Sequence, residues 1–333
     1  MLASVTSLFA LALIAAAARG THIHPRFKPG ETLYYQIETH TASTGKTTTP
    51  IINPEGGTNF SENVDLLARL DVLPDGDSAG GAKLQQGGEQ ALIRMRVTYE
   101  RAHADSQADA PAFGAPSAAH EYDRLAGRSF EFTLQPSGAI TNLKDTDNTL
   151  QNVRDIAPAA LSWIRMLETS SSYPQRGISA GQRWTGEIPL DGAPLAGLVW
   201  HANSTYLRNE PCKPSALENG ATSGTAGAAG QCAVILTQFE ILRRGSQHAD
   251  QTPPDYLRHG LRTTGTLTGT GESLDSISLS SGVLVSSTQT STQRADFDII
   301  DAANGEKIHR AGKVQTQTVI TRVAPPEPAP AQP

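Results

Sequence analysis

Over long stretches this sequence alternates between apolar and polar residues. In residues 64–72 nearly every second side chain is apolar, and charged residues such as Asp65 and Asp71 lie between them. Residues 91–99 repeat the pattern, with arginines among the polar positions. A period of two is the period of a β-strand. A strand with one charged face is typical of an antiparallel sheet with one solvated side.

Further segments carry the same signal. Residues 130–134 lead through a Pro-Ser-Gly turn at 136–138 into a return strand that begins near Ile140. Strands are also expected at residues 198–207, 232–242 and 314–323. The chain is therefore expected to be rich in long antiparallel strands.

The region between residues 145 and 169 has helical spacing instead. Leu150, Val153 and Ile156 lie three residues apart, and a second apolar series follows Pro158. Proline does not fit inside a regular helix. We expect two short helices or one kinked helix, with the apolar side packed on a sheet.

Two parts of the chain resemble each other. Residues 28–38 and 179–190 both begin with a glycine turn followed by a strand, and residues 130–143 match 274–287 as strand, Ser-Gly turn and strand. We predict a mainly β fold (β-rich α+β) of two related curved antiparallel sheets or half-barrels, with a short helical segment packed on or between them. Chance similarity between hairpins is the alternative to this internal repeat.

The N-terminus predicts export. Residues 8–18 form an apolar run that is too short to span a hydrocarbon core of roughly 30 Å. Ala16 and Ala18 fit a cleavage site before Arg19. We expect a periplasmic or extracellular protein with no transmembrane span in the mature chain.

These features divide the chain into six parts. We expect a signal peptide at 1–18, a mobile N-terminal segment at 19–27, a first β-sheet half at 28–144, a helical connector at 145–178, a second β-sheet half at 179–323 and a disordered Pro-rich tail at 324–333.

The cysteines are consistent with the predicted export. Cys212 and Cys232 are the two cysteines of the chain, and they flank a stretch rich in Gly, Ala, Ser and Thr. In an oxidising compartment they are expected to form a disulfide that closes this loop. A redox-active pair would have closer spacing.

Composition and motifs exclude several functions. A net charge of −6 does not provide the basic surface that nucleic-acid binding needs, so no nucleic-acid partner is expected. His22 and His24 have a chelating H-x-H spacing, but no further ligands stand near them, and an exposed chain start explains them better. We assign no catalytic, cofactor-binding or metal-binding residue.

Aromatic residues on the expected strands have two interpretations. They fill a core between sheet and helices, or they line a concave apolar pocket. The candidate ligand-lining residues are Tyr35, Phe130, Phe132, Trp184, Trp200 and Phe239.

The opening strand at 28–38, the long antiparallel strands and the hairpin at 130–143 resemble secreted bacterial β-rich proteins. Those bacterial proteins are in turn distantly similar to the half-barrel of the periplasmic lipoprotein-carrier group. The resemblance rests on strand and turn patterns, and it transfers no functional residue. It implies an envelope protein that holds a lipid or lipopeptide in a concave apolar sheet.

Three function classes remain open. The first is a non-enzymatic envelope protein that binds an apolar ligand such as a lipid. The second is a structural or protein-interaction module with an envelope protein as partner. The third, an unrecognised hydrolase, requires polar residues with shifted pKa values in one cleft.

Overall fold

The structure, a computed structural model, describes most of the long strands and some of the connections between them. The described residues are 23, 26–49, 57–74, 92–109, 118–135, 140–145, 163–164, 173–174, 177–190, 193–212, 230–245 and 250–326. The predicted signal peptide at 1–18 lies outside them. So do most of the connector at 145–178, the loop between the two cysteines and the end of the tail.

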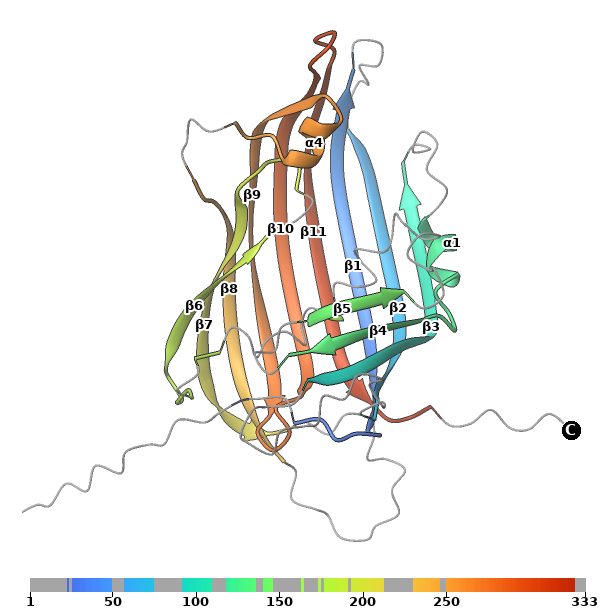
Figure 1. Ribbon diagram of the computed structural model, residues 1–333, viewed down its shortest axis with the longest axis vertical. Helices are drawn as coiled ribbons and strands as arrows, with labels where there is room; N and C mark the ends of the chain where they lie inside the picture. Colours follow the sequence, from blue (N-terminus) through green and yellow to red (C-terminus); the bar gives the residue numbers. More distant parts are fainter. Residues whose placement is uncertain are drawn as a thin grey trace, which may run out of the picture.

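Within the described ranges eleven strands form one antiparallel sheet, in the order β5-β4-β3-β2-β1-β11-β10-β9-β8-β7-β6 (Figure 1). Two short helices, α1 and α4, accompany them. The elements are β1 (Thr32–Thr48), β2 (Thr58–Val72), β3 (Ile93–Ala108), α1 (Ala118–Asp123), β4 (Ser129–Leu134), β5 (Ile140–Asp145), β6 (Arg183–Pro189), β7 (Leu198–Pro211), β8 (Gln231–Arg243), α4 (Pro254–Arg258), β9 (Leu261–Ser278), β10 (Leu284–Asp301) and β11 (Lys307–Val323). The prediction of a mainly β, antiparallel fold is confirmed.

The strands of the two predicted halves share this single sheet. β1 to β5 and β6 to β11 are each ordered as in the chain, and β1 pairs with β11 from Tyr34–Val323 to Thr48–His309. The two predicted sheets or half-barrels are therefore the two halves of a single sheet. The alternation of side chains predicts each strand, but it does not predict which other strand lies next to it in the sheet.

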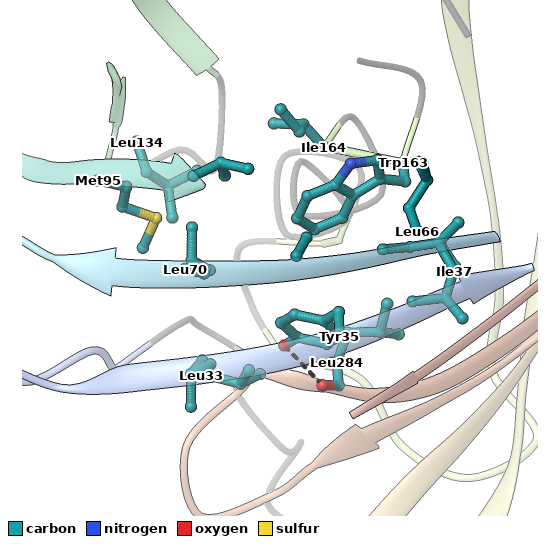
Figure 2. Close-up of a cluster of buried hydrophobic side chains, with 14 of the residues drawn as sticks. Leu33, Tyr35, Ile37, Leu66, Leu70, Met95, Leu134, Trp163, Ile164 and Leu284 are labelled. Atoms are coloured by element: carbon teal, nitrogen blue, oxygen red, sulfur yellow. Dashed lines mark hydrogen bonds between the residues drawn. The ribbon is translucent and has the colours of Figure 1, made fainter. Parts of the chain in front are cut away.

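The sheet curls over its own inner face, which we define as the face that carries Leu33, Tyr35 and Ile37. β4 and β5 cross in front of β1 and β2 in Figure 1. Apolar side chains of β4 thereby join those of β1, β2 and β3 in one buried cluster (Figure 2). A bulge between Leu67 and Ala68 interrupts the β2–β3 register, and bulges increase the local bend of a strand.

A short part of the predicted connector closes this core. Trp163 and Ile164 are buried in the same cluster. The Trp163 Nε1 donates a hydrogen bond of 3.2 Å to the Tyr99 hydroxyl, and its ring centroid lies 5.9 Å from that of Tyr35. The rest of the expected helices lies outside the described residues.

The segment 19–27, expected to be mobile, contacts the sheet at its described residues. Ile23 is buried in the core, and Phe27 packs against it. The backbone N–H of Arg26 donates a hydrogen bond to the Ser281 carbonyl. Apolar burial therefore holds this part of the segment in place.

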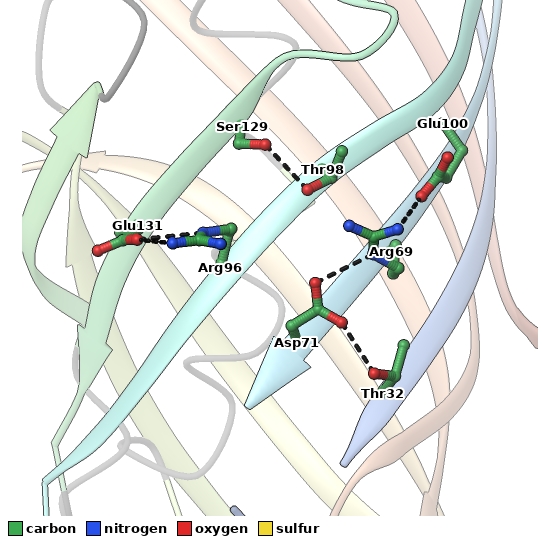
Figure 3. Close-up of polar contacts among 8 residues, drawn as sticks. All are labelled: Thr32, Arg69, Asp71, Arg96, Thr98, Glu100, Ser129 and Glu131. Atoms are coloured by element: carbon green, nitrogen blue, oxygen red, sulfur yellow. Dashed lines mark hydrogen bonds and ion pairs between the residues drawn. The ribbon is translucent and has the colours of Figure 1, made fainter. Parts of the chain in front are cut away.

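The outer face, opposite the core, carries ion pairs between neighbouring strands (Figure 3). Glu131 of β4 accepts hydrogen bonds from Arg96 and Arg94 of β3, and these arginines lower the pKa of its carboxyl, the Arg96 bond most of all. Arg69 contacts both Asp71 and Glu100. These pairs are solvent-accessible, so they favour the register more than they add to stability.

The predicted disulfide is confirmed. Cys212 and Cys232 are bonded, with 4.9 Å between their Cα atoms and a sequence separation of 20. The bond ties the end of β7 to the start of β8, where Glu210 pairs with Cys232 in the sheet. It closes the loop that joins these two strands.

Leu70 provides a test of the core. Its side chain is fully buried on the inner face, so Leu70→Ala should lower the free energy of unfolding by about 2 to 5 kcal/mol through lost burial and a residual cavity. Leu274, which is 45% exposed on the outer face of β9, is the matched control. Leu274→Ala should change that free energy by less than about 0.5 kcal/mol in urea denaturation. Equal effects would contradict the assignment of the two faces.

Reduction should destabilise the protein. Opening a loop of this length costs on the order of 3 kcal/mol in the chain-entropy account of disulfides. Unfolding in urea with and without dithiothreitol measures the loss, and a double Cys212→Ser, Cys232→Ser variant should no longer respond to the reductant. Two free thiols in non-reducing mass spectrometry of protein purified without reductant would contradict the bond.

Candidate functional site

The six candidate aromatic residues divide into two groups. Tyr35, Phe130 and Phe132 are fully buried, and they belong to the core cluster of β1 to β4. The Tyr35 hydroxyl donates a hydrogen bond of 3.0 Å to the Leu284 carbonyl, and burial raises the pKa of this phenol. In the structure these three rings fill space between layers of the sheet.

Trp184, Trp200 and Phe239 lie on the inner face of β6, β7 and β8, and Trp184 also packs against the core cluster. Each is half-buried. The rings of Trp200 and Phe239 meet edge to face, with 5.1 Å between their centroids. We call this pair the aromatic platform. Trp184 lies farther along the face and is not part of this pair: its sheet partner is Ser204, and its ring meets that of Tyr173 edge to face, with 5.7 Å between their centroids.

Two glycines of β9 make room for the platform. Gly269 and Gly271 point to the inner face, opposite Ile241 and Phe239 of β8. A Cβ atom on Gly269 would lie 3.1 Å from the Trp200 ring, and one on Gly271 would overlap the Phe239 ring. The absence of side chains here lets both rings lie against the backbone of β9. The two rings are therefore packed against β9 and remain half-buried.

Apolar residues extend this surface. A second buried cluster on the inner face contains Leu195, Leu198, Ile241 and Phe297, and Trp200 packs against it. Ile188 of β6, the sheet partner of Trp200, is 51% exposed. The indole N–H of Trp184 is buried and has no hydrogen-bond partner among the described residues. The inner face of β6 to β9 thus offers apolar contacts.

A buried carboxyl lies farther along the inner face of β9, toward the β9–β10 turn. Asp275 of β9 accepts hydrogen bonds from the hydroxyls of Ser287, at 2.6 Å, and Ser273, at 3.1 Å. Burial raises the pKa of Asp275, although both serine hydrogen bonds oppose the shift. The two partners are serines, so the group has no imidazole to activate a nucleophile. We interpret it as a structural polar network.

Metal and membrane features are absent from the described part of the chain. It contains no group of three or more His, Cys, Asp or Glu side chains able to hold a metal ion. The H-x-H pair of His22 and His24 lies outside that part. No helix within it is long and apolar enough to cross a membrane.

Sequence analysis missed the glycines and the aspartate. Gly269, Gly271 and Asp275 all lie at inner-face positions of β9, where alternation predicts apolar residues. A glycine inside a strand indicates a close approach of another group. This signal was present in the sequence, but the approaching rings come from β7 and β8 and are not identifiable from β9 alone.

Comparison with known proteins gives the chain no family. No family model matches the sequence, and no curated protein matches it. A solved structure of lipovitellin, described by its lipid–protein interactions, aligns with a TM-score of 0.44 and 10% identity over 92% of this chain. This chain spans 27% of that one.

A second structure, from work on the asymmetric conductivity of engineered proteins, aligns with a TM-score of 0.18 and 9% identity over 86% of this chain and 99% of its own. Neither similarity supports the resemblance to the bacterial lipoprotein-carrier group. The inferences below rest on this chain's own geometry.

Replacing Asp275 by Asn should stabilise the protein at neutral pH. The folded pKa of Asp275 is raised above its unfolded value. The stability that depends on its neutral form is therefore complete below the unfolded pKa and is lost as pH rises through the folded pKa. Asparagine has nearly the same shape as aspartate and carries no charge. In urea denaturation, the free energy of unfolding of Asp275→Asn should equal that of the unsubstituted protein near pH 3 and exceed it increasingly toward pH 7. An advantage independent of pH would contradict this account.

Proposed function

We propose that the protein is an exported, non-enzymatic cell-envelope protein that binds an apolar ligand, such as a lipid or lipopeptide, on the inner face of its sheet. The observation that carries the proposal is the aromatic platform of Trp200 and Phe239. Core aromatic rings such as Tyr35 are fully buried, whereas these two are half-buried on a floor of glycines. A ligand that covers them removes the remaining apolar surface from water.

The chemistry of the surface supports an apolar ligand. Covering apolar surface contributes about 25 cal/mol per Å², and aromatic side chains offer large areas at a low cost in side-chain entropy. Ile188 extends the surface toward the sheet edge.

Two features support export. The disulfide between Cys212 and Cys232 belongs to an oxidising environment. The apolar run at residues 8–18, with small residues before Arg19, has the form of a signal peptide. Together they motivate a search for the ligand in the cell envelope.

A protein-interaction module is the second candidate, and the sheet edges favour it. β5 and β6 are the outermost strands of an open sheet. An edge strand presents backbone N–H and C=O groups that can pair with a partner's strand. This candidate predicts that substitutions on the platform leave partner binding unchanged.

Native mass spectrometry of protein purified from its own envelope, followed by lipid extraction, tests the apolar-ligand proposal. We expect a stoichiometric adduct of lipid mass that unfolding releases. A clean apo mass together with no binding of added palmitoyl-lysophosphatidylcholine would contradict the proposal and favour the interaction module.

Substitution of the platform should weaken this binding. Trp200→Ala and Phe239→Ala should each raise the dissociation constant for palmitoyl-lysophosphatidylcholine about tenfold or more, corresponding to about 1.4 kcal/mol. Tyr34→Ala, a half-buried aromatic residue on the outer face of β1, is the control and should bind as the unsubstituted protein does. Urea midpoints establish that each variant is folded. Equal loss in all three variants would indicate a general effect on the sheet.

A further inference from the structure

The outer face carries one continuous polar row that crosses nine strands. Its members are paired directly from strand to strand, beginning at β6 and ending at β3. All nine are exposed. In sheet order they are Thr185, Asn203, Gln238, Glu272, Thr290, Gln317, His40, Asn63 and Asp105.

The middle of this row is hollowed. A depression of about 560 Å³ spans β9, β10, β11 and β1, and a second of about 390 Å³ spans β11, β1, β2 and β3. His40 and Gln317 line both, so the two form one trough that runs across the strands. Five steps of about 4.8 Å between neighbouring strands make it roughly 24 Å long.

The lining of this trough is neutral or acidic. Threonine hydroxyls and the amides of Gln315, Gln317 and Asn63 contribute much of its surface. Four carboxylates are spread along it, those of Glu272, Glu38, Asp65 and Asp105. No lysine or arginine is among the residues that line either depression. This composition disfavours phosphates and other anions. The few apolar side chains disfavour an acyl chain.

The backbone beneath the trough is also unable to bind a peptide strand. Its N–H and C=O groups are engaged in the ladders on both sides of each strand, so peptide addition is restricted to the sheet edges. A ligand in the trough must be recognised by side chains alone. Hydroxyl and amide side chains both donate and accept hydrogen bonds, and carboxylates accept them. A chain of hydroxyl groups matches this inventory.

We propose that the trough binds a neutral glycan strand that runs across the β-strands. The regular step between strands presents a new hydrogen-bonding side chain to each part of the polymer. His40 and Asn63 are already oriented by a mutual hydrogen bond of 2.7 Å between the imidazole Nδ1 and the amide Oδ1. His103, at one end, is held between Asp105 and Asp123. This site is separate from the aromatic platform, which lies on the opposite face.

Isothermal titration of the full-length protein with three neutral hexasaccharides, cellohexaose, chitohexaose and maltohexaose, tests the proposal. We expect at least one of them to bind. Binding of none of the three by folded protein would overturn the proposal. Binding of hexalysine, lost in Glu272→Gln, in place of the sugars would also overturn it and assign the trough to a cationic peptide.

A pair of glutamines locates the site. Gln317→Ala, in the trough, should weaken sugar binding tenfold or more. Gln289→Ala, on the inner face of β10, should leave it unchanged. Equal affinity in both variants would place the sugar elsewhere and overturn the assignment. Neither variant should alter binding of palmitoyl-lysophosphatidylcholine, so failure of this proposal is distinguishable from failure of the apolar-ligand proposal.

Discussion

The pairing of β1 with β11 holds the rest of the sheet together. It joins strands from opposite ends of the chain and aligns the inner-face residues Ile37 and Ile320, both of which are buried in the core. It also brings the start of β10 close to β1, so that the Leu284 carbonyl accepts a hydrogen bond from the Tyr35 hydroxyl. Without this ladder the chain would form two open meanders, each with an additional unpaired edge. Such edges invite association with other chains.

The sheet extends well beyond the apolar core that this ladder organises. Near the β9–β10 turn the inner face is buried, and Asp275 lies there hydrogen-bonded to two serines. In the middle of the same strands both faces are polar, with Gln289 and Thr318 on the inner face and Thr290 and Gln317 on the outer, before the inner face becomes apolar again at Phe297. Backbone ladders hold this part with little apolar burial. In this part of the sheet the long strands therefore support the side chains on the two faces and do not enclose a core.

Local alternation was sufficient to identify strands and insufficient to assemble them. The segments at 64–72 and 314–323 were identified as strands because each alternates within itself, whereas the β1–β11 register depends on residues nearly 300 positions apart. The same reasoning did not separate buried from half-buried aromatic residues. Tyr35 and Trp200 both lie on predicted strands, but Tyr35 is covered by the curl of β4 and by Trp163, and Trp200 is not. Burial of a ring depends on what crosses over it, which is a property of tertiary structure.

The two proposed surfaces depend on the register of a single strand. Along β9, Gly269 and Gly271 point inward beneath the aromatic platform, and Thr270 and Glu272 point outward into the trough. Because successive side chains alternate between faces, a slip of one residue would place threonine and glutamate side chains under the rings and glycines in the trough. Both sites would be lost together. The steric exclusion at Gly271 and the bulge-free β9–β8 register thus constrain both faces, although the ligands proposed for the two faces differ in chemistry.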